Sequence, residues 1–151
     1  MAETAVPRVA HPILENDYAS EWMGIEVLAL SDGHATVRMT LRQEMLNGFG
    51  MAHGGMIFAF ADSAFALACN PASPADPDSI TVAAGVDINF LKPAYQGQVI
   101  TAVADRRSSA GRSGLYDIQI FAADPGAELT SGKPGELIAE FRGRSRTIPK
   151  K

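Results

Sequence analysis

The sequence predicts an α+β domain in which one long helix packs against one antiparallel sheet. A continuous apolar stretch without proline, residues 54–69, has the length of a helix. Two shorter stretches before it and four longer ones after it have the composition of strands, and turn-forming glycines and prolines separate them. A helix that is apolar on all sides has to be wrapped by the sheet or buried against a partner.

The length and composition suit a single compact domain over residues 1–151. Apolar residues make up 46% of the chain, which is enough for an ordinary core without disulfide bonds or structural metal ions. Residues 1–12 are mixed in character and contain proline, so we expect a flexible arm there.

Charge and cysteine content narrow the classes of partner and compartment. The net charge of −4 argues against nucleic acid as the main partner, since phosphate binding needs a basic surface. Cys69 is the single cysteine and lies in an apolar run, which predicts a small buried hydrophobic side chain in a reducing compartment. We expect no secretory signal and no membrane span, and therefore a soluble, cytoplasmic protein.

The N-terminal half predicts a short helix, two strands and a loop. Asn16 or Asp17 can cap a helix through "DYASEWM", and Gly24 would end it. Two strands then flank a turn at 31–33, and the second alternates apolar and polar residues from Val37 onward, which is typical of a half-buried strand. The stretch "RQEMLNGFGMA" predicts a loop.

The long helix and the remaining strands complete the domain. Asn70–Pro71 would end the helix, and the following proline-rich loop, 71–78, excludes regular structure. A loop at 124–135 joins the last two strands. The four predicted strands of this half are 79–91, 98–108, 114–123 and 135–148.

Two glycines, Gly54 and Gly55, stand at the start of the long helix. The first N–H groups of a helix lack internal partners and carry the positive end of its dipole. Glycine lets a ligand approach this backbone closely, so the position suits an oxygen that becomes negative during a reaction. Alternatively, the glycines only permit a tight turn from loop to helix.

A carboxylate, Asp62, interrupts the same apolar helix. A charge in such a helix is costly unless it is paired or functional. Asp62 could take a proton from water or attack an acyl carbon, since desolvated carboxylates cluster at active sites. A structural hydrogen bond to Ser63 or to nearby backbone is the alternative.

Two further residues accompany the glycines. His53 precedes them and could shape the site or only orient the turn. Asn47 lies in the preceding loop, where its amide could position a water or a carbonyl group, or could stabilise a turn. Both residues have a structural alternative that is common for their type.

The spacing between Gly54 and Asp62 predicts a dimer. Eight helical residues rise ~12 Å and leave the two positions about 80° apart around the axis. One chain therefore cannot bring both groups to the same carbonyl. Two antiparallel copies of the helix about a two-fold axis would place each Asp62 near the other chain's Gly54, giving two shared sites.

The stretch "LNGFGMAHGGMIFAFADSAFALACN" resembles the hot-dog-fold acyl-CoA thioesterases of the PaaI type. The resemblance extends through "DINFLKPAYQGQ" and "GRSGLYDIQIF" to "FRGRS", and covers roughly residues 17–148. An isolated His-Gly-Gly is a weak signal, but the acid eight residues after the first glycine makes the pattern specific.

The resemblance implies a helix wrapped by a curved antiparallel sheet, a homodimer that usually pairs into a tetramer, and hydrolysis of phenylacetyl-CoA or a hydroxylated relative. Asp62 would be nucleophile or general base, the Gly54 N–H would polarise the thioester carbonyl, Asn47 would hold water or the carbonyl, and His53 would shape the site. No cofactor is implied, because coenzyme A is part of the substrate. Direct attack by Asp62 and attack through water both remain open.

The phosphates of coenzyme A would bind cationic side chains and N–H groups, which should therefore gather at one entrance (mouth) of the site. Arg112 lies in a glycine-containing turn whose N–H groups can contact anions, and Lys92 ends a strand. Arg144 alternates with Arg142 and Arg146 on one face of the last strand. A solvated surface charge is the alternative for each. The remaining candidates for substrate contact are Gly55, Ser63, Gly111 and Ser113.

Two other functions fit the same fold. A non-catalytic acyl-CoA sensor needs no carboxylate opposite an oxyanion donor, so Asp62 favours the enzyme. A hydratase would need a His paired with an acid in another arrangement than "HGG". Compared with the family that it resembles, this sequence has Ser63 where threonine is common, a longer loop at 124–135 and a more apolar loop "NGFGM".

Overall fold

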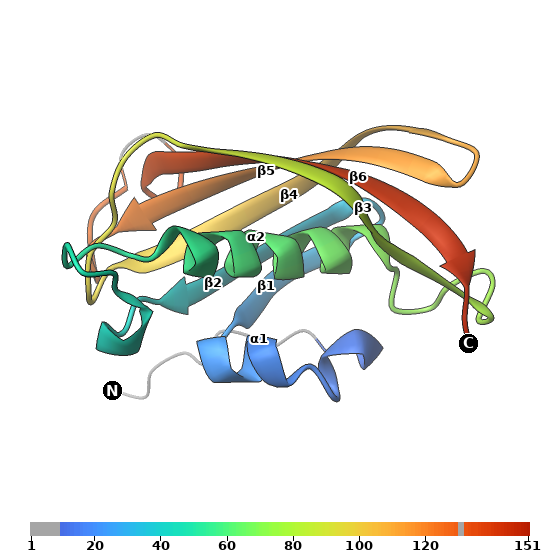
Figure 1. The fold of residues 1–151 in the computed structure, drawn as a ribbon, viewed down its shortest axis with the longest axis horizontal. Helices are drawn as coiled ribbons and strands as arrows, with labels where there is room; N and C mark the ends of the chain where they lie inside the picture. Colours follow the sequence, from blue (N-terminus) through green and yellow to red (C-terminus); the bar gives the residue numbers. More distant parts are fainter. Residues whose placement is uncertain (1–9, 130–131) are drawn as a thin grey trace.

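The computed structural model describes residues 10–129 and 132–151 and confirms the predicted α+β hot-dog architecture (Figure 1). Two strands precede the long helix and four follow it, as the sequence predicts. The helices are α1 (Tyr18–Met23) and α2 (Gly54–Cys69), with short 3₁₀ turns η1 (Pro12–Leu14) and η2 (Gln43–Met45); the strands are β1 (Glu26–Ser31), β2 (His34–Thr40), β3 (Ser79–Phe90), β4 (Val99–Ala110), β5 (Ser113–Ala123) and β6 (Glu136–Pro149).

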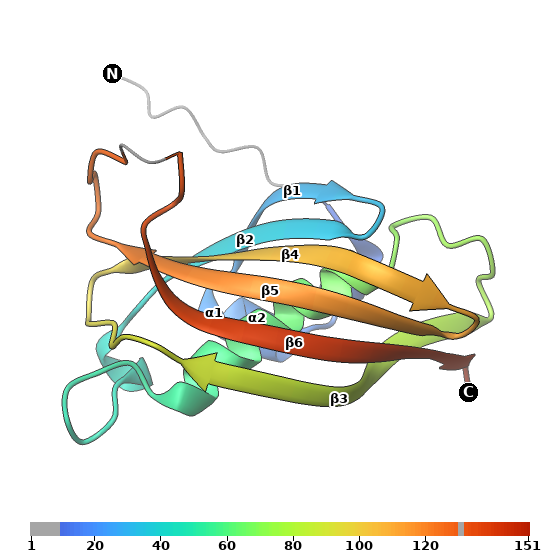
Figure 2. The same cartoon turned by 90° about the horizontal axis from the view of Figure 1, so that it is seen from above.

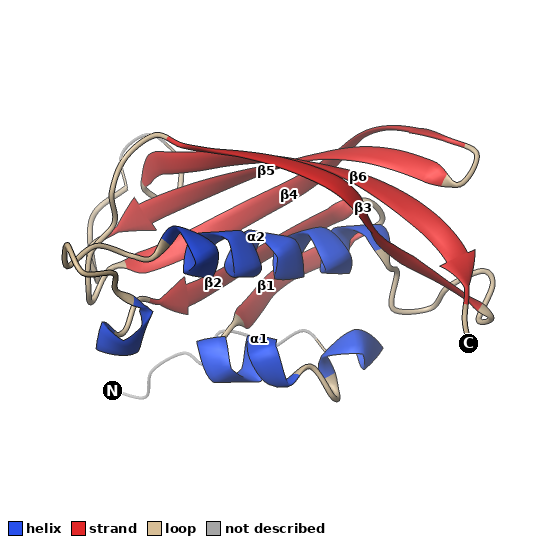
Figure 3. Ribbon diagram, in the orientation of Figure 1, coloured by secondary structure: helices blue, strands red, loops and turns tan. Residues whose placement is uncertain are grey.

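The six strands form one antiparallel sheet in the order β1-β2-β4-β5-β6-β3. The sheet curves over α2, and α1 lies on the far side of α2 from the sheet (Figures 1 and 3). Seen from above, β1 and β3 are the two edges of the sheet and α2 crosses beneath it (Figure 2). The long helix is therefore held between the sheet and α1.

Strand alternation places the core between the sheet and α2. On β6, Phe141, Gly143 and Ser145 are buried, whereas the three arginines between and after them are exposed. A Cβ at Gly143 would lie only 2.6 Å from the Phe65 ring of α2, so glycine here lets the helix approach the sheet closely. The predicted common face of Arg142, Arg144 and Arg146 is thus confirmed as the outer face.

The short helix α1 forms as its capping residues predict. Asp17 is the N-cap, with Oδ1 accepting a hydrogen bond from the Ser20 N–H at 3.0 Å. Gly24 ends the helix in the left-handed region, at φ 73°. Ser20 Oγ meets Ser63 Oγ at 2.8 Å, and this contact joins α1 to α2.

The expected arm is packed at its end. Residues 1–9 lie outside the described residues, but His11 is buried, with Nε2 2.6 Å from the Asn70 carbonyl oxygen at the end of α2. Its Nδ1 accepts a hydrogen bond from the Ile13 N–H, so the ring carries its proton on Nε2. The prediction of a flexible arm is therefore wrong for His11 and Pro12, because a buried imidazole fixes them.

The sheet covers only one side of α2. Eight residues of the helix are buried, but Asp62 is partly exposed, and Phe58 is 37% exposed although its ring lies 5.5 Å from that of Phe141 on β6. Cys69 is buried as predicted, and burial raises the pKa of its thiol to about 12. Within residues 10–129 and 132–151, no helix is long and apolar enough to cross a membrane.

Candidate active site

The start of α2 leaves one backbone donor available. His53 is the N-cap: its Nδ1 accepts a hydrogen bond from the Gly55 N–H at 3.1 Å, and its carbonyl accepts one from the Met56 N–H at 2.9 Å. The His53 N–H itself donates to the Met45 carbonyl at 2.8 Å. In the described part of the chain, the Gly54 N–H is the first-turn donor without a partner. His53 thus has a clear structural role, and of the two glycines Gly54 is the one that can bind an oxygen.

An apolar pocket of about 390 Å³ opens beside Gly54. A Cβ at this position would lie 3.2 Å from the tip of the Phe90 ring, so a side chain here would crowd the pocket wall. Phe90 and Leu91 are the walls that sequence reasoning missed. The lining residues are Met51, Ala52, Gly54, Ile57, Phe90, Leu91, Lys92 and Pro93.

A larger pocket, of about 580 Å³, lies on the outer face of the sheet. It is lined by residues of β1, β2 and β4, such as Leu28, Thr36 and Val103, and by the loop after β5. None of the residues predicted for the site lines it. Size alone therefore does not identify the reactive site of this fold, and the chemistry favours the smaller pocket.

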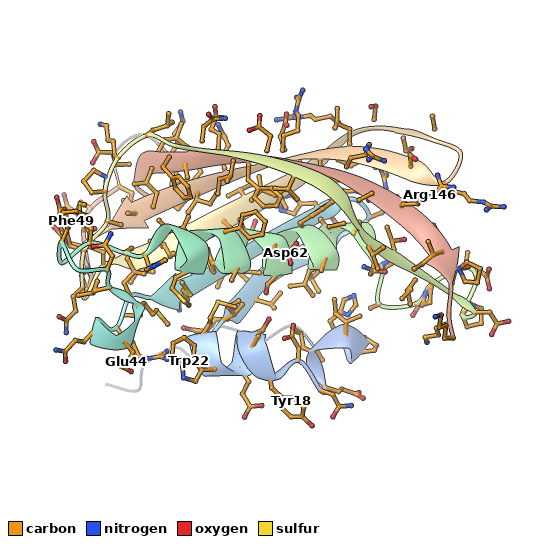
Figure 4. All side chains as sticks on the ribbon, viewed as in Figure 1. Tyr18, Trp22, Glu44, Phe49, Asp62 and Arg146 are labelled. Carbon is orange, nitrogen blue, oxygen red and sulfur yellow. The ribbon has the colours of Figure 1, made fainter. Side chains whose placement is uncertain are left out.

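Asp62 lies at the middle of α2, above α1 (Figure 4). Its carboxylate is partly buried and accepts no hydrogen bond from any described residue. The expected local partner, Ser63, is bonded to Ser20 instead. Burial raises the pKa of Asp62 above its usual value, and the negative charge of Asp17 raises it further. A carboxylate with a raised pKa and free lone pairs is suited to accept a proton or to attack an acyl carbon.

Within one chain, Gly54 and Asp62 are too far apart along α2 to act on the same carbonyl group. The helix is continuous from Gly54 to Cys69, so the rise of ~12 Å between the two positions persists in the structure. A thioester carbonyl on the Gly54 N–H is therefore out of reach of the Asp62 carboxylate in the same chain.

The amide oxygen of Asn47 is used inside its own loop. Its Oδ1 accepts hydrogen bonds from the Phe49 N–H at 2.9 Å and the Met51 N–H at 3.2 Å. Both lone pairs are occupied, so Asn47 has only its NH₂ group to offer to a water or a carbonyl oxygen. The same loop presents Phe49, which is 86% exposed, at the end of the molecule (Figure 4).

The cationic residues predicted for the coenzyme do not gather within one chain. Lys92 follows β3 near the start of α2 and is ion-paired with Glu136. Arg112 is exposed in the turn between β4 and β5, beside Gly111, whose φ is 59°. In the sheet Ser113 lies opposite Arg146, which lies opposite Val82 on β3. Val82 precedes Phe90 by eight residues, so about 26 Å of strand separates the Arg112 turn from Lys92.

Arg144 projects from the outer face of β6 and donates from Nη2 to the Ala84 carbonyl at 3.3 Å. Its neighbour Arg142 is engaged with Asp117 at 2.7 and 3.0 Å. Figure 4 shows Arg146 at the opposite end of the molecule from Phe49. Arg146 therefore lies far from the Gly54 pocket of its own chain.

Comparison with known proteins identifies the family of the chain. The sequence model of the thioesterase superfamily matches residues 49–128. The acyl-coenzyme A thioesterase PaaI of Escherichia coli is 37% identical over 139 residues, covering 92% of this chain and 89% of the relative.

Solved structures give the same result. The E. coli PaaI protein from the phenylacetic acid degradation operon superimposes with a TM-score of 0.78 at 34% identity, covering 93% of this chain and 91% of that one. A mutant of phenylacetic acid degradation protein PaaI from Thermus thermophilus gives 0.72 at 31% identity, with 86% and 98% covered. The chain therefore belongs to the thioesterase superfamily and is a thioester hydrolase with the hot-dog fold.

Proposed function

We propose that the protein hydrolyses the thioester of an aromatic acyl-CoA, with the Gly54 N–H as oxyanion donor and Asp62 as nucleophile or general base. The unpartnered Gly54 N–H beside an apolar pocket is the observation that carries this proposal. A donor at a helix start is already oriented toward an oxygen that becomes negative, which is the requirement of acyl transfer. The raised pKa of Asp62 supports its role, because a base works best when its pKa approaches the working pH.

The proposed site is shared by two chains. β3 is an edge strand with an open hydrogen-bonding ladder, and its side chains Ile80, Val82 and Phe90 are exposed. Pairing of two β3 edges about a two-fold axis would cover these side chains and extend the sheet. The two α2 helices would then run antiparallel and bring each Asp62 toward the Gly54 of the partner. A tetramer would be a further pairing of such dimers.

The same pairing would assemble the coenzyme mouth. Because the two β3 strands run antiparallel, the Arg112 end of one chain comes beside the Lys92 end of the other. Cationic groups that are about 26 Å apart along one chain's strand would thereby meet at each of two mouths. Gly111 and Ser113 would add backbone donors there, and Asn47 would donate to the carbonyl or the water.

Substitution of Arg112 by alanine tests this mouth. We expect KM for the acyl-CoA to rise with little change in kcat, since a phosphate contact serves ground state and transition state alike. The increase should shrink as salt rises, because exposed charges are screened. Arg107→Ala is the matched control: it removes an exposed arginine of β4 that pairs with Asp117. An unchanged KM at low salt for Arg112→Ala would leave Arg112 as a surface charge.

The aromatic acyl group rests on the pocket and on the relatives. The pocket walls include Phe90, Leu91 and Ile57, which suit a flat apolar group. The names of both solved relatives refer to phenylacetic acid degradation. Hydrolysis needs no metal in this proposal; no three metal-binding side chains lie together in residues 10–129 and 132–151.

A panel of aromatic and aliphatic acyl-CoAs, scored by released thiol, tests the function. We expect turnover to be fastest with arylacetyl and related aromatic esters and to be unchanged by EDTA. Faster turnover of aliphatic esters would refute the substrate class, and zinc-restored activity would refute the metal-free mechanism. Tight binding of every ester without thiol release would identify the alternative, a non-catalytic acyl-CoA sensor.

A further inference from the structure

A short chain of hydrogen bonds runs from the start of α1 to the middle of α2. Asp17 Oδ2 accepts from the Ser20 hydroxyl at 2.6 Å, and Ser20 Oγ meets Ser63 Oγ at 2.8 Å. The Ser20 proton is committed to the carboxylate, so the Ser63 hydroxyl must donate to Ser20. Ser20 is buried, and Asp17 also caps α1 through Oδ1. The carboxylate of Asp17 is therefore held in one orientation.

This series of hydrogen bonds ends at Ser63, beside Asp62. Ser63 is the next residue on α2, and the Asp17 carboxylate is close enough for its charge to disfavour the ionised form of Asp62. Neither Asp17 nor Ser20 belongs to the proposed reaction itself. Their arrangement nevertheless places a fixed negative charge next to the carboxylate that the reaction needs.

The other surroundings of Asp62 are neutral in the described part of the chain. Cys69, further along α2, is a buried thiol that stays protonated. Glu21 on α1 is exposed to solvent, which screens its charge. The core-facing side chains of the sheet that pack near α2 are uncharged, such as Val37, Ile118 and Tyr116, whose pKa is raised by burial. Asp17 is thus the charged group that α1 brings to Asp62.

We propose that Asp17, held through Ser20 and Ser63, is a positioning residue that sets the pH range over which Asp62 acts. The proposal rests on the catalytic role proposed for Asp62. A nearby negative charge raises the pKa of a carboxylate. The carboxylate is then a stronger base, but it is ionised, and so able to act as a base, only at higher pH. Removal of the charge should have the opposite effect on both properties.

Asp17→Asn removes the charge and keeps an excellent N-cap, so α1 should remain folded. The pH dependence of kcat/KM reports groups of the free enzyme. We expect its acid limb to move to lower pH, while the plateau falls because Asp62 becomes a weaker base. The ratio of variant to wild-type rate should therefore exceed one on the acid limb and lie below one on the plateau. Simple structural damage would lower the rate at every pH and give no such crossing.

Glu21→Gln is the matched control, since it removes one carboxylate from the same helix without touching the hydrogen-bonded chain. Its pH profile should coincide with that of the wild type. Ser20→Ala keeps the charge but releases it toward water, so the acid limb should move in the direction of Asp17→Asn by a smaller amount. An unmoved limb in Ser20→Ala would refute the role of the tether.

A second measurement separates this inference from the proposed function. Carbon-13 NMR of the side-chain carboxyls, assigned with Asp62→Asn, gives the pKa of Asp62 without any turnover. We expect a lower pKa in Asp17→Asn than in the wild type and in Glu21→Gln. An unchanged pKa overturns the inference, whatever the enzyme assay shows. A lowered pKa together with a fully active Asp62→Asn variant would instead overturn the catalytic role of Asp62.

Discussion

Asp62→Asn is expected to lower kcat for aryl-acyl-CoA hydrolysis by at least ~10²–10⁴-fold, the range of general-base catalysis. The substitution keeps the shape of the side chain but removes the charge, and with it the ability to accept a proton or attack the acyl carbon. Measured by thiol release, the loss should appear in kcat. Calorimetric binding of a non-hydrolysable CoA thioether should survive, because the phosphates bind elsewhere.

Asp105→Asn supplies the control for this variant. It is the same chemical change on the outer face of the sheet, where Asp105 pairs with His34 at 2.7 Å. It should leave kcat near the wild-type value. If Asp62→Asn retained a rate within about threefold of wild type, far short of the expected range, the catalytic role of Asp62 would be wrong.

The same variant should be more stable than the wild type at neutral pH. The pKa of Asp62 is raised in the folded protein above its usual 3.8, so ionised Asp62 lowers the free energy of unfolding. Below pH 3.8 the group is protonated in both states and the penalty disappears. The Tm advantage of Asp62→Asn should therefore be present at pH 7 and vanish as the pH falls through the folded and then the unfolded pKa. A lower Tm of Asp62→Asn at pH 7 would contradict the stability penalty assigned to ionised Asp62.

A mixed dimer of two inactive variants is expected to recover about half of wild-type activity, since one of its two sites is whole. The variants are Asp62→Ala and Gly54→Pro. Proline fits the first helical position, where the lost N–H has no described partner, and the extended backbone of His53, at φ −64° and ψ 132°, is compatible with a following proline. Gly54→Ala controls for crowding of Phe90 while keeping the donor.

The recovery depends on how the site is divided between chains. With differently tagged chains co-expressed and the mixed species isolated, one site receives both lesions and the other receives neither. If each chain built a complete site alone, every site would carry one lesion and no activity would return. A correctly assembled but inactive mixed dimer would therefore refute the division of Gly54 and Asp62 between chains, and with it the argument from their ~12 Å separation.

The boundaries of the elements could be predicted because local residues determine them. Asp17 and Gly24 delimit α1, Asn70 and Pro71 follow α2, and period-two alternation marks β2 and β6. The start of α2 at Gly54 was also expected, and so was its continuous course past Asp62. Such signals act within a few residues, so they are readable without the tertiary structure.

Features that depend on tertiary distance could not be predicted. The sequence does not reveal that the length of β3 places Lys92 and Arg112 at opposite ends of the chain's own sheet. It suggested Ser63 as a partner of Asp62, whereas the packing of α1 gives Ser63 to Ser20. Asp17 was recognisable as a helix cap, but its proximity to Asp62 follows only from the docking of α1 on α2.

The outer edge of β3 also bears on how a newly made chain avoids non-specific association. An open edge with exposed aliphatic side chains is a template for any passing strand, and proteins commonly limit this hazard with bulges and charges. Here a bulge interrupts the β3–β6 pairing between Ala83 and Gly85, and Asp87 adds an exposed carboxylate. A bulge bends the strand and increases its twist, so a flat strand of another protein would fit this edge poorly. The bulge and the carboxylate would therefore limit aggregation of newly made chains whose β3 edge has not yet been covered by the proposed pairing.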